Sequence, residues 1–209
     1  RELTVQRANL DGSGAEVLAS GLANPMGIAV DGPRGMVYWG DNMAIYKMTI
    51  EGTDVETLLD RSVVTVPVGV AIETKYQKLY WTDESQDRIC RANFDGSEVE
   101  ELYVGTSQPQ DISIDIPNDR LYWSDGYSTI LYAPLDGSET PTVIVTDAPA
   151  VRLFVDKMEE KIYWTERRDR AIMRANLDGS DQEYFKSSTD GLASPTCITV
   201  MLNETLTTT

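Results

Sequence analysis

The chain of 209 residues contains no histidine. Histidine is the most frequent general base of enzymes, a common zinc ligand and the base of Ser-His-Asp triads. Its absence counts against all three chemistries, and we expect a protein that is not an enzyme.

Cysteine is nearly as scarce, with Cys90 and Cys197 as the only two. Two cysteines are too few for a disulfide framework or a cysteine-rich zinc site. We interpret both as small buried hydrophobic residues. No cofactor is expected.

Basic residues are in the minority, with 18 Lys and Arg against 34 Asp and Glu and a net charge of −16. Binding to nucleic acid needs a basic face, so nucleic acid is not expected as a partner. An acidic surface favours solubility and attracts cationic ligands. No apolar run approaches the ~20 residues that cross a membrane, so we expect no direct membrane insertion by this segment.

What the sequence does contain is a Tyr-Trp pair followed two residues later by an acid, repeated four times. The tryptophans recur every 41 or 42 residues and are the only ones in the chain. A period of this length indicates a repeat architecture. The motif residues are Tyr38, Trp39 and Asp41; Tyr80, Trp81 and Asp83; Tyr122, Trp123 and Asp125; Tyr163, Trp164 and Glu166.

Each repeat carries four short strand signals. In the first strand, large apolar residues alternate with a column of mostly small ones, and Phe154 departs from this column, so we expect a local bulge there. An Asp-Gly turn between the third and fourth strands is typical of a hairpin. Four strands per repeat predict the blades of an all-β propeller, whose stacked faces bury one another. The tryptophan column is the expected filler between blades.

These segments resemble the class B repeats of the low-density lipoprotein receptor family. The Tyr-Trp-Thr-Asp motifs carry the resemblance, with the Gly-Ile-Ala-Val-Asp strand at 27–31 and the Arg-Ala-Asn-Leu-Asp-Gly-Ser turns at 7–13 and 174–180. The resemblance covers nearly the whole chain. It implies a six-bladed extracellular propeller, secreted or in the ectodomain of a cell-surface receptor. It also implies adjacent epidermal-growth-factor-like modules in a longer parent chain.

The chain supplies fewer than six blades. We expect complete blades at about 21–62, 63–105, 106–146 and 147–190, a partial blade at 1–20, and the first strand of another at 195–202. Two interpretations stay open, a fragment of a six-bladed ring or a reduced propeller of about five blades. Residues 203–209 form a Thr-rich tail or linker, and Asn203 begins the only Asn-X-Ser/Thr sequon, a predicted glycosylation site.

The connections between strands indicate which face binds. The turns between the first and second strands and between the third and fourth strands keep a constant length in every repeat, whereas the other two connections vary. In an up-and-down blade the two constant turns share one face, here called the turn face. The variable connections share the opposite one, the loop face. Variable loops on a rigid scaffold are where repeat proteins usually bind partners.

Candidate ligand-binding residues follow from their place on the loop face. Asp111 and Arg152 occupy a column that holds Gly27 and Gly69 in other repeats, so they are the strongest candidates for polar contacts at the channel mouth. The alternatives are a solvated rim charge or a mutual ion pair. The remaining candidates are Met26, Asn42, Val68, Glu84, Gln110, Tyr127, Arg167 and Arg168.

Two columns of acids recur once per blade. A ring of carboxylates could bind calcium. A residue needed in every blade more often serves that blade's own structure, by accepting backbone N–H bonds across a blade junction, so no metal is expected. The columns are the motif acids Asp41, Asp83, Asp125 and Glu166, and the strand-end acids Asp31, Glu73, Asp115 and Asp156.

Three functions remain open from the sequence. The first is a propeller of a low-density-lipoprotein-receptor-related receptor, endocytic or of the Wnt co-receptor type, which binds basic or extended segments of protein ligands on the loop face. The second is an extracellular-matrix adaptor of the nidogen type. The third is a calcium-dependent propeller hydrolase, against which the absence of histidine counts.

Overall fold

The computed structural model describes residues 2–126, 128–191 and 195. Regular structure in these residues is strand, apart from two single 3-10 turns at Glu84–Gln86 and Ser188–Asp190. No helix in this described part is long and apolar enough to span a membrane. Tyr127, Cys197, Asn203, the strand predicted within 195–202 and the tail at 203–209 lie outside it, apart from Pro195.

The strands form four antiparallel sheets of four strands and one sheet of two. Each four-stranded sheet pairs consecutive strands in chain order, as the predicted propeller blades require. The partial blade contains β1 (Val5–Arg7) and β2 (Glu16–Ala19). Blade 1 contains β3 (Pro25–Asp31), β4 (Met36–Asp41), β5 (Ala44–Thr49) and β6 (Glu56–Leu59). Blade 2 contains β7 (Pro67–Glu73), β8 (Lys78–Asp83), β9 (Arg88–Asn93) and β10 (Glu100–Val104). Blade 3 contains β11 (Ile112–Asp115), β12 (Arg120–Asp125), β13 (Thr129–Pro134) and β14 (Thr142–Thr146). Blade 4 contains β15 (Ala150–Asp156), β16 (Lys161–Glu166), β17 (Ala171–Asn176) and β18 (Glu183–Lys186).

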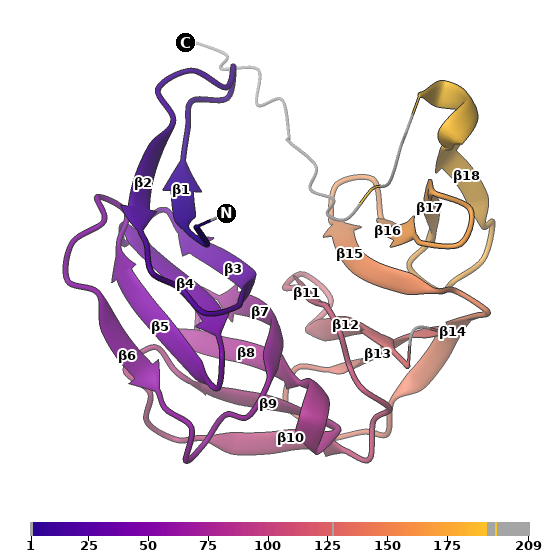
Figure 1. Ribbon diagram of the computed structural model, residues 1–209. Coiled ribbons are helices and arrows are strands. Elements are labelled where there is room, and N and C mark those ends of the chain that lie inside the picture. The colour runs from indigo at the N-terminus through magenta and orange to yellow at the C-terminus, as the bar shows by residue number, and fades with distance from the viewer. Residues whose placement is uncertain (1, 127, 192–194, 196–209) are drawn as a thin grey trace, which may run out of the picture.

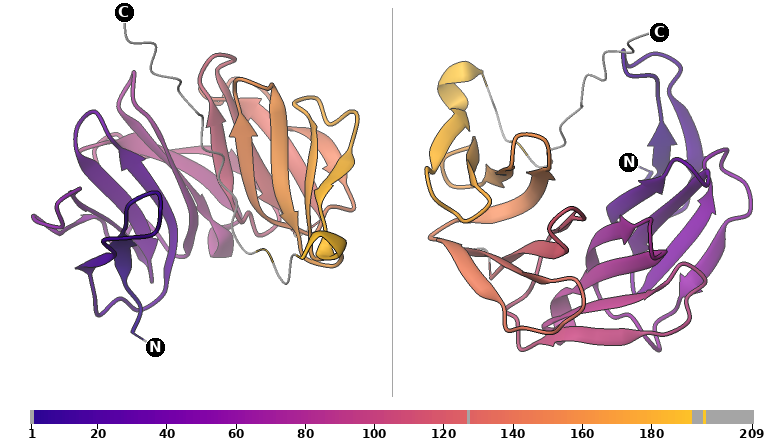
Figure 2. Two further views of the ribbon diagram at one scale, coloured as in Figure 1. Left: turned by 90° about the horizontal axis from the view of Figure 1, so that it is seen from above. Right: turned by 180° about the vertical axis from the view of Figure 1, so that it is seen from behind.

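The blades follow one another around an arc (Figure 1), with the first strand of each blade toward the centre and the fourth at the periphery. The same arc is visible from behind in the right panel of Figure 2. The all-β propeller predicted from the repeat is therefore confirmed, with four complete blades and the two-stranded partial blade before them.

The Tyr-Trp pair joins neighbouring blades. Because successive side chains of a strand point to opposite faces, the tryptophan of each pair packs on the preceding blade, and the tyrosine of each of the first three pairs packs toward the following one. Trp81 lies in one buried cluster with Tyr38 and Ile45 of blade 1, and Trp123 lies in another with Tyr80 of blade 2. All four tryptophans are at most 1% exposed. Their indole N–H groups have no hydrogen-bond partner in the described residues, so apolar packing alone holds them.

The third motif residue completes these junctions with polar contacts. The Thr82 hydroxyl accepts the Gly69 N–H at 2.7 Å and donates to the Gln110 carbonyl of blade 3 at 2.8 Å. Blade 1 has Gly40 instead, where a Cβ would lie 2.6 Å from the Pro67 carbonyl oxygen of blade 2. The Thr82 hydroxyl thus bridges the junction of blades 2 and 3, whereas Gly40 closes the junction of blades 1 and 2 by direct contact.

A cation on the third strand reaches forward to the next blade. Arg7 and Arg91 each donate to a turn carbonyl of the following blade, Ile50 and Leu135 respectively, at 2.8 Å. Lys47 donates to the Phe94 carbonyl in the same way at 3.5 Å. Each of these cations also pairs with a fourth-strand glutamate of its own sheet. These acids are Glu16, Glu56 and Glu100.

The prediction of a bulge at Phe154 was wrong. Phe154 pairs regularly with Tyr163, and the register shift of β15 falls earlier, between Ala150 and Leu153. β3 and β7 shift at the corresponding place, just after their prolines. The irregularity therefore belongs to the start of the strand in these blades and not to the larger side chain. Cys90, in contrast, is buried and unpaired as predicted, and burial raises the pKa of its thiol to about 12.

The inner strands of blades 1 and 2 touch backbone to backbone at Gly27. A Cβ there would lie 2.5 Å from the Val70 nitrogen and 2.6 Å from the Val68 oxygen. We expect Gly27→Ala to lower the free energy of unfolding by about 1–3 kcal/mol, the usual cost of overpacking, as measured by urea denaturation. Gly32→Ala is the matched control, because a Cβ at Gly32 meets nothing within 4 Å. An equal effect of the two variants would contradict the close approach of the inner strands.

Candidate functional site

The motif acids anchor the variable connections of the loop face. Asp83 accepts the backbone N–H groups of Thr65 and Val66 at 3.0 and 2.9 Å. Asp41 accepts those of Ala23 and Asn24. Asp125 accepts the Ser107 N–H at 2.8 Å. Each carboxylate therefore fixes the segment that arrives from the preceding blade, which is the structural use predicted for this column.

Glu166 breaks this pattern in blade 4. Its longer side chain accepts the N–H groups of Arg168 and Asp169, in the loop that follows it. The incoming segment keeps a backbone bond, from the Arg167 N–H to the Pro149 carbonyl at 3.4 Å, which blade 2 also has between Glu84 and Val66. The loop that carries the two predicted arginines is thus tied down locally, with both side chains exposed.

The strand-end acids serve the turn face. The Glu73 carboxylate accepts the N–H groups of Lys75 and Tyr76, both at 2.6 Å, and Asp156 accepts those of Met158 and Glu159. In the described part of the chain, no group of three or more His, Cys, Asp or Glu side chains is placed to hold a metal ion. Each acid of this kind stabilises a turn of its own blade.

Asp111 and Arg152 meet at the junction of the inner strands of blades 3 and 4. The Asp111 carboxylate accepts the Leu153 N–H at 2.9 Å, and the Ser113 hydroxyl accepts the Val155 N–H at 3.2 Å. These side chains bridge the inner strands of blades 3 and 4, whereas the inner strands of blades 1 and 2 touch directly at Gly27. Burial raises the pKa of Asp111, and the Arg152 charge and the Leu153 N–H lower it by less. The carboxylate is therefore used inside the protein, across a blade junction.

Arg152 has donor capacity that the described residues leave unused. Its backbone N–H donates to the Thr165 hydroxyl at 3.2 Å, but its Nη1 atom is shielded from solvent and has no hydrogen-bond partner in the part of the chain that the structure describes. A shielded cationic donor without an acceptor is costly. Because the residue as a whole is half-buried, an outside acceptor would remove that cost once the guanidinium turns toward solvent.

Two of the predicted contact residues are buried. Val68 is 1% exposed and belongs to the core. Gln110 is 4% exposed, and its amide donates to the Glu84 carboxylate at 2.8 Å. The bond between Gln110 and Glu84 joins the loops of blades 2 and 3. Neither Val68 nor Gln110 presents a surface to a partner in this structure.

Met26 and Asn42 come together in a hollow of about 120 Å³ between blades 1 and 2, which Asn24, Met43, Thr65, Val66 and Pro67 also line. Asn42 and Met43 form the two-residue connection between β4 and β5 and both have positive φ, 39° and 71°. Methionine in this left-handed region is strained, and strained exposed residues gather at functional sites. Met43 is not among the residues predicted from the sequence. The two-residue spacing beginning with asparagine was the signal that could have indicated this turn.

Comparison with known families returns the repeat that the motif resembles. The family model of the low-density lipoprotein receptor repeat class B matches residues 160–200. These residues include the fourth Tyr-Trp strand and the Arg-Ala-Asn-Leu-Asp-Gly-Ser turn. The other repeats carry the same motif at constant spacing.

Curated relatives are receptors of this kind. A low-density lipoprotein receptor-related protein 1 of Pyricularia oryzae is 31% identical over 127 residues, which are 56% of this chain and 40% of that protein. The vitellogenin receptor of Solenopsis invicta is 33% identical over 55% of this chain, and low-density lipoprotein receptor-related protein 5 of Mus musculus 31% over 52%. The matched region is 7% of each of these two receptors. The chain thus spans less than half the length of the relatives it matches.

Solved structures share the fold. A nidogen/laminin complex contains a chain that superposes with a TM-score of 0.81 at 21% identity, over 90% of this chain and 73% of that one. A catalytically inactive H270A virginiamycin B lyase from Staphylococcus aureus superposes with a TM-score of 0.68 at 19% identity, over 92% of this chain and 64% of the lyase. The replaced residue of that lyase is a histidine, a residue type that this chain lacks altogether.

The surroundings of Asp111 predict an unusual titration. We expect its carboxyl to titrate above 3.8, because burial disfavours its charge, and Asp11 to titrate below 3.8, because Ser13 hydrogen-bonds to it. Carboxyl-carbon NMR measures both. Arg152→Gln should raise the Asp111 midpoint further and leave Asp11 unchanged. Since the folded-state pKa of Asp111 lies above its unfolded value, this group's contribution to stability increases as the pH falls through the raised pKa. A midpoint below 3.8 would refute the argument from burial.

Proposed function

Because the chain is a propeller of low-density lipoprotein receptor class B repeats, we propose that it is an extracellular protein-binding module whose partner docks on the loop face. The observation that carries this proposal is the half-buried side chain of Arg152, whose Nη1 atom has no acceptor in the described residues. It lies near the loop-face end of the inner strands, among connections that vary in length from blade to blade. Variable loops on a rigid scaffold are a common arrangement for binding.

The chemistry of this face favours a partner with two features. An acceptor oxygen, from a carboxylate or a backbone carbonyl, would satisfy the guanidinium of Arg152, and arginine is common among the residues that dominate binding energy. An apolar side chain would fit the hollow beside Met26 and Met43. The charge of −16 would attract basic or extended segments of the same partner during the encounter.

The parent protein in this proposal is a receptor of the low-density-lipoprotein-receptor-related type, endocytic or of the Wnt co-receptor kind, with epidermal-growth-factor-like modules beside the propeller. The blades extend over about 21–62, 63–105, 106–146 and 147–190, and Asn203 carries a glycan. The curated relatives support the receptor assignment. A propeller hydrolase is not proposed, because these relatives are receptors and the chain contains no histidine.

A matrix adaptor is the second candidate. The fold shared with a chain of the nidogen/laminin complex, at a TM-score of 0.81, favours it. The two candidates differ in what the loop face meets, a receptor ligand or a laminin-like matrix protein.

Binding should depend on Arg152 and not on the turn face. The purified chain is immobilised and exposed to laminin and to individually purified extracellular proteins. For the partner found, we expect Arg152→Met to weaken affinity by tenfold or more, since losing a shielded charged contact costs about 2–5 kcal/mol. Lys157→Met, which removes an exposed cation from the turn after β15, should leave affinity unchanged.

Cross-linking coupled to mass spectrometry then places the partner. Cross-links on the loop face with laminin alone would favour the adaptor over the receptor. Cross-links confined to the turn face, or equal affinities of the wild type and a stably folded Arg152→Met, would overturn the proposal.

A further inference from the structure

The turn face has a hollow of its own at the junction of blades 2 and 3, with a volume of about 380 Å³. Blade 2 contributes Tyr76, Lys78, Tyr80 and Arg91, and blade 3 contributes Asp119, Pro134, Leu135 and Asp136. Tyr76 and Asp119 stand in the turns between first and second strands, and Asp136 stands in a turn between third and fourth strands. The hollow therefore lies opposite the variable loops.

The preceding junction shows what such a position can hold. Arg34 of blade 1 occupies the repeat position of Tyr76, four residues before the motif tyrosine. Its guanidinium lies 5.8 Å from the centroid of the Phe94 ring, pairs with Asp31 at 3.1 Å and donates to the Thr74 carbonyl of blade 2 at 3.3 Å. Between blades 1 and 2 the chain thus places its own cation over an aromatic ring.

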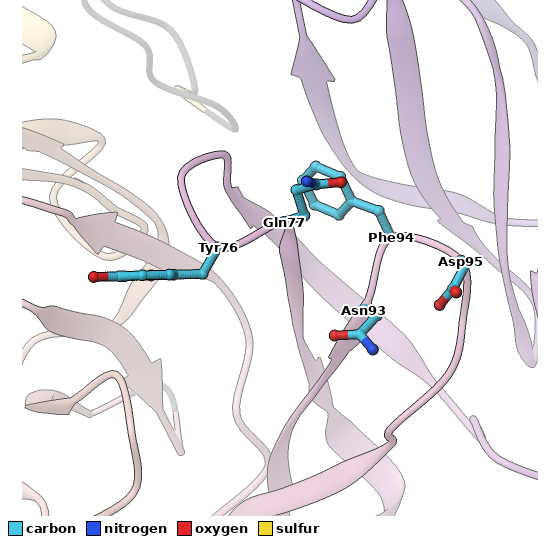
Figure 3. Close-up of a pocket in the computed structure, with 5 residues that line it drawn as sticks. All are labelled: Tyr76, Gln77, Asn93, Phe94 and Asp95. Atoms are coloured by element: carbon cyan, nitrogen blue, oxygen red, sulfur yellow. The ribbon is translucent and has the colours of Figure 1, made fainter.

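The junction of blades 2 and 3 has no such cation. Its residue at the Arg34 position is Tyr76, and the shorter Leu135 stands where Phe94 stands in blade 2. Figure 3 shows a second hollow beside this one, lined by Tyr76, Gln77, Asn93, Phe94 and Asp95. The Tyr76 ring points away from Phe94 and from this second hollow. Tyr76 is 63% exposed, and the Lys75 ammonium lies 4.6 Å from the centroid of its ring. The chain thus places one cation beside this ring, and a partner's cation would bind to the part of the ring that Lys75 leaves exposed.

The acids around this hollow outnumber the cations by one. Lys78 pairs with Glu98 at 3.1 Å and Arg91 with Glu100 at 2.7 Å. Of the two acids on the blade 3 side, Asp119 adds to the effect of Tyr76 in raising the pKa of Lys75. Hydrogen bonds from Ser138, and in part the Arg91 charge, lower the pKa of Asp136 and keep it ionised. An aromatic ring, an apolar wall at Leu135 and two carboxylates together suit a cationic side chain.

We propose that this hollow binds the side chain of an arginine or lysine in an extended segment of a partner protein. The bound cation takes the place that Arg34 holds at the neighbouring junction. Its stem packs along Leu135 and Pro134, its charge faces Asp119 and Asp136, and its head lies against Tyr76. The site is separate from the loop face and does not depend on what binds there.

The probe is the peptide acetyl-Gly-Arg-Gly-amide, titrated into the isotope-labelled chain and followed by amide NMR shifts. We expect shifts at Tyr76, Asp119, Leu135 and Asp136. The peptide with citrulline in place of arginine, which has nearly the same shape without the charge, should give none. The double variant Asp119→Asn and Asp136→Asn should weaken binding by about tenfold, the effect of losing about 1.4 kcal/mol.

A matched control separates a site from general attraction to an acidic protein. Asp54→Asn combined with Asp11→Asn removes the same charge from other blades. Asp54 shares the left-handed backbone of Asp119, with φ of 55° against 51°, and Asp11 shares the serine cap of Asp136. This control should bind like the wild type. Tyr76→Arg should fill the hollow with an internal cation, as Arg34 does, and abolish binding.

Three results would overturn the proposal. They are the absence of shifts at the hollow, equal weakening by both double variants, and equal binding of the citrulline peptide. Thermal unfolding of each variant verifies that it is folded, so a loss of binding is attributable to the site.

Discussion

The packing of adjacent aromatic residues on opposite faces of one strand is the interaction on which the rest of the structure depends. Trp81 reaches back into blade 1, and Tyr80 reaches forward into blade 3. A single four-stranded sheet cannot bury both of its faces, so each blade is stable only between neighbours. The second strand therefore transmits packing from one blade to the next. The contacts of the inner strands, the acid anchors and the loops are all arranged around these junctions.

The junctions are alike in their apolar packing and differ in their polar details, and these differences create the sites. Gly27 and Gly69 let the inner strands of blades 1, 2 and 3 approach one another closely, whereas Asp111 ties the inner strands of blades 3 and 4 through its carboxylate. On the turn face, Arg34 covers Phe94 at one junction, and Tyr76 leaves a hollow beside Leu135 at the next. A repeat protein can thus acquire a site by substitutions in two columns, here at the positions of Tyr76 and Leu135, because the two blades already supply the remaining walls.

Properties that recur once per repeat could be predicted from the sequence, because repetition reveals the constraint. The blades, the burial of the tryptophans and the anchoring role of the acids belong to this class. Properties that depend on residues from two different columns of the repeat could not be predicted from the sequence. Val68 is buried where its backbone closely approaches Gly27 of blade 1, the Asp111 carboxylate accepts the Leu153 N–H, and the turn-face hollow needs Tyr76 and Leu135 from different repeats. Glu166 shows a further limit, since one additional methylene redirects its hydrogen bonds from the incoming to the outgoing loop.

The forward-reaching cations of the third strands give the blade interface a direction. A donor on one blade meets a carbonyl on the next, as Arg91 meets Leu135, so the two surfaces of a blade are complementary to each other and not to themselves. Such a heterologous contact propagates along the chain, and a symmetric pairing of like surfaces would not reproduce it. In genetic terms, duplication of a unit that carries the cation, such as blade 2, would insert both a donor and its acceptor. Blade 3, with Tyr132 at this position, would supply the acceptor alone. Arg174, paired with Glu183 in blade 4 at 2.6 Å, repeats the donor half of this arrangement.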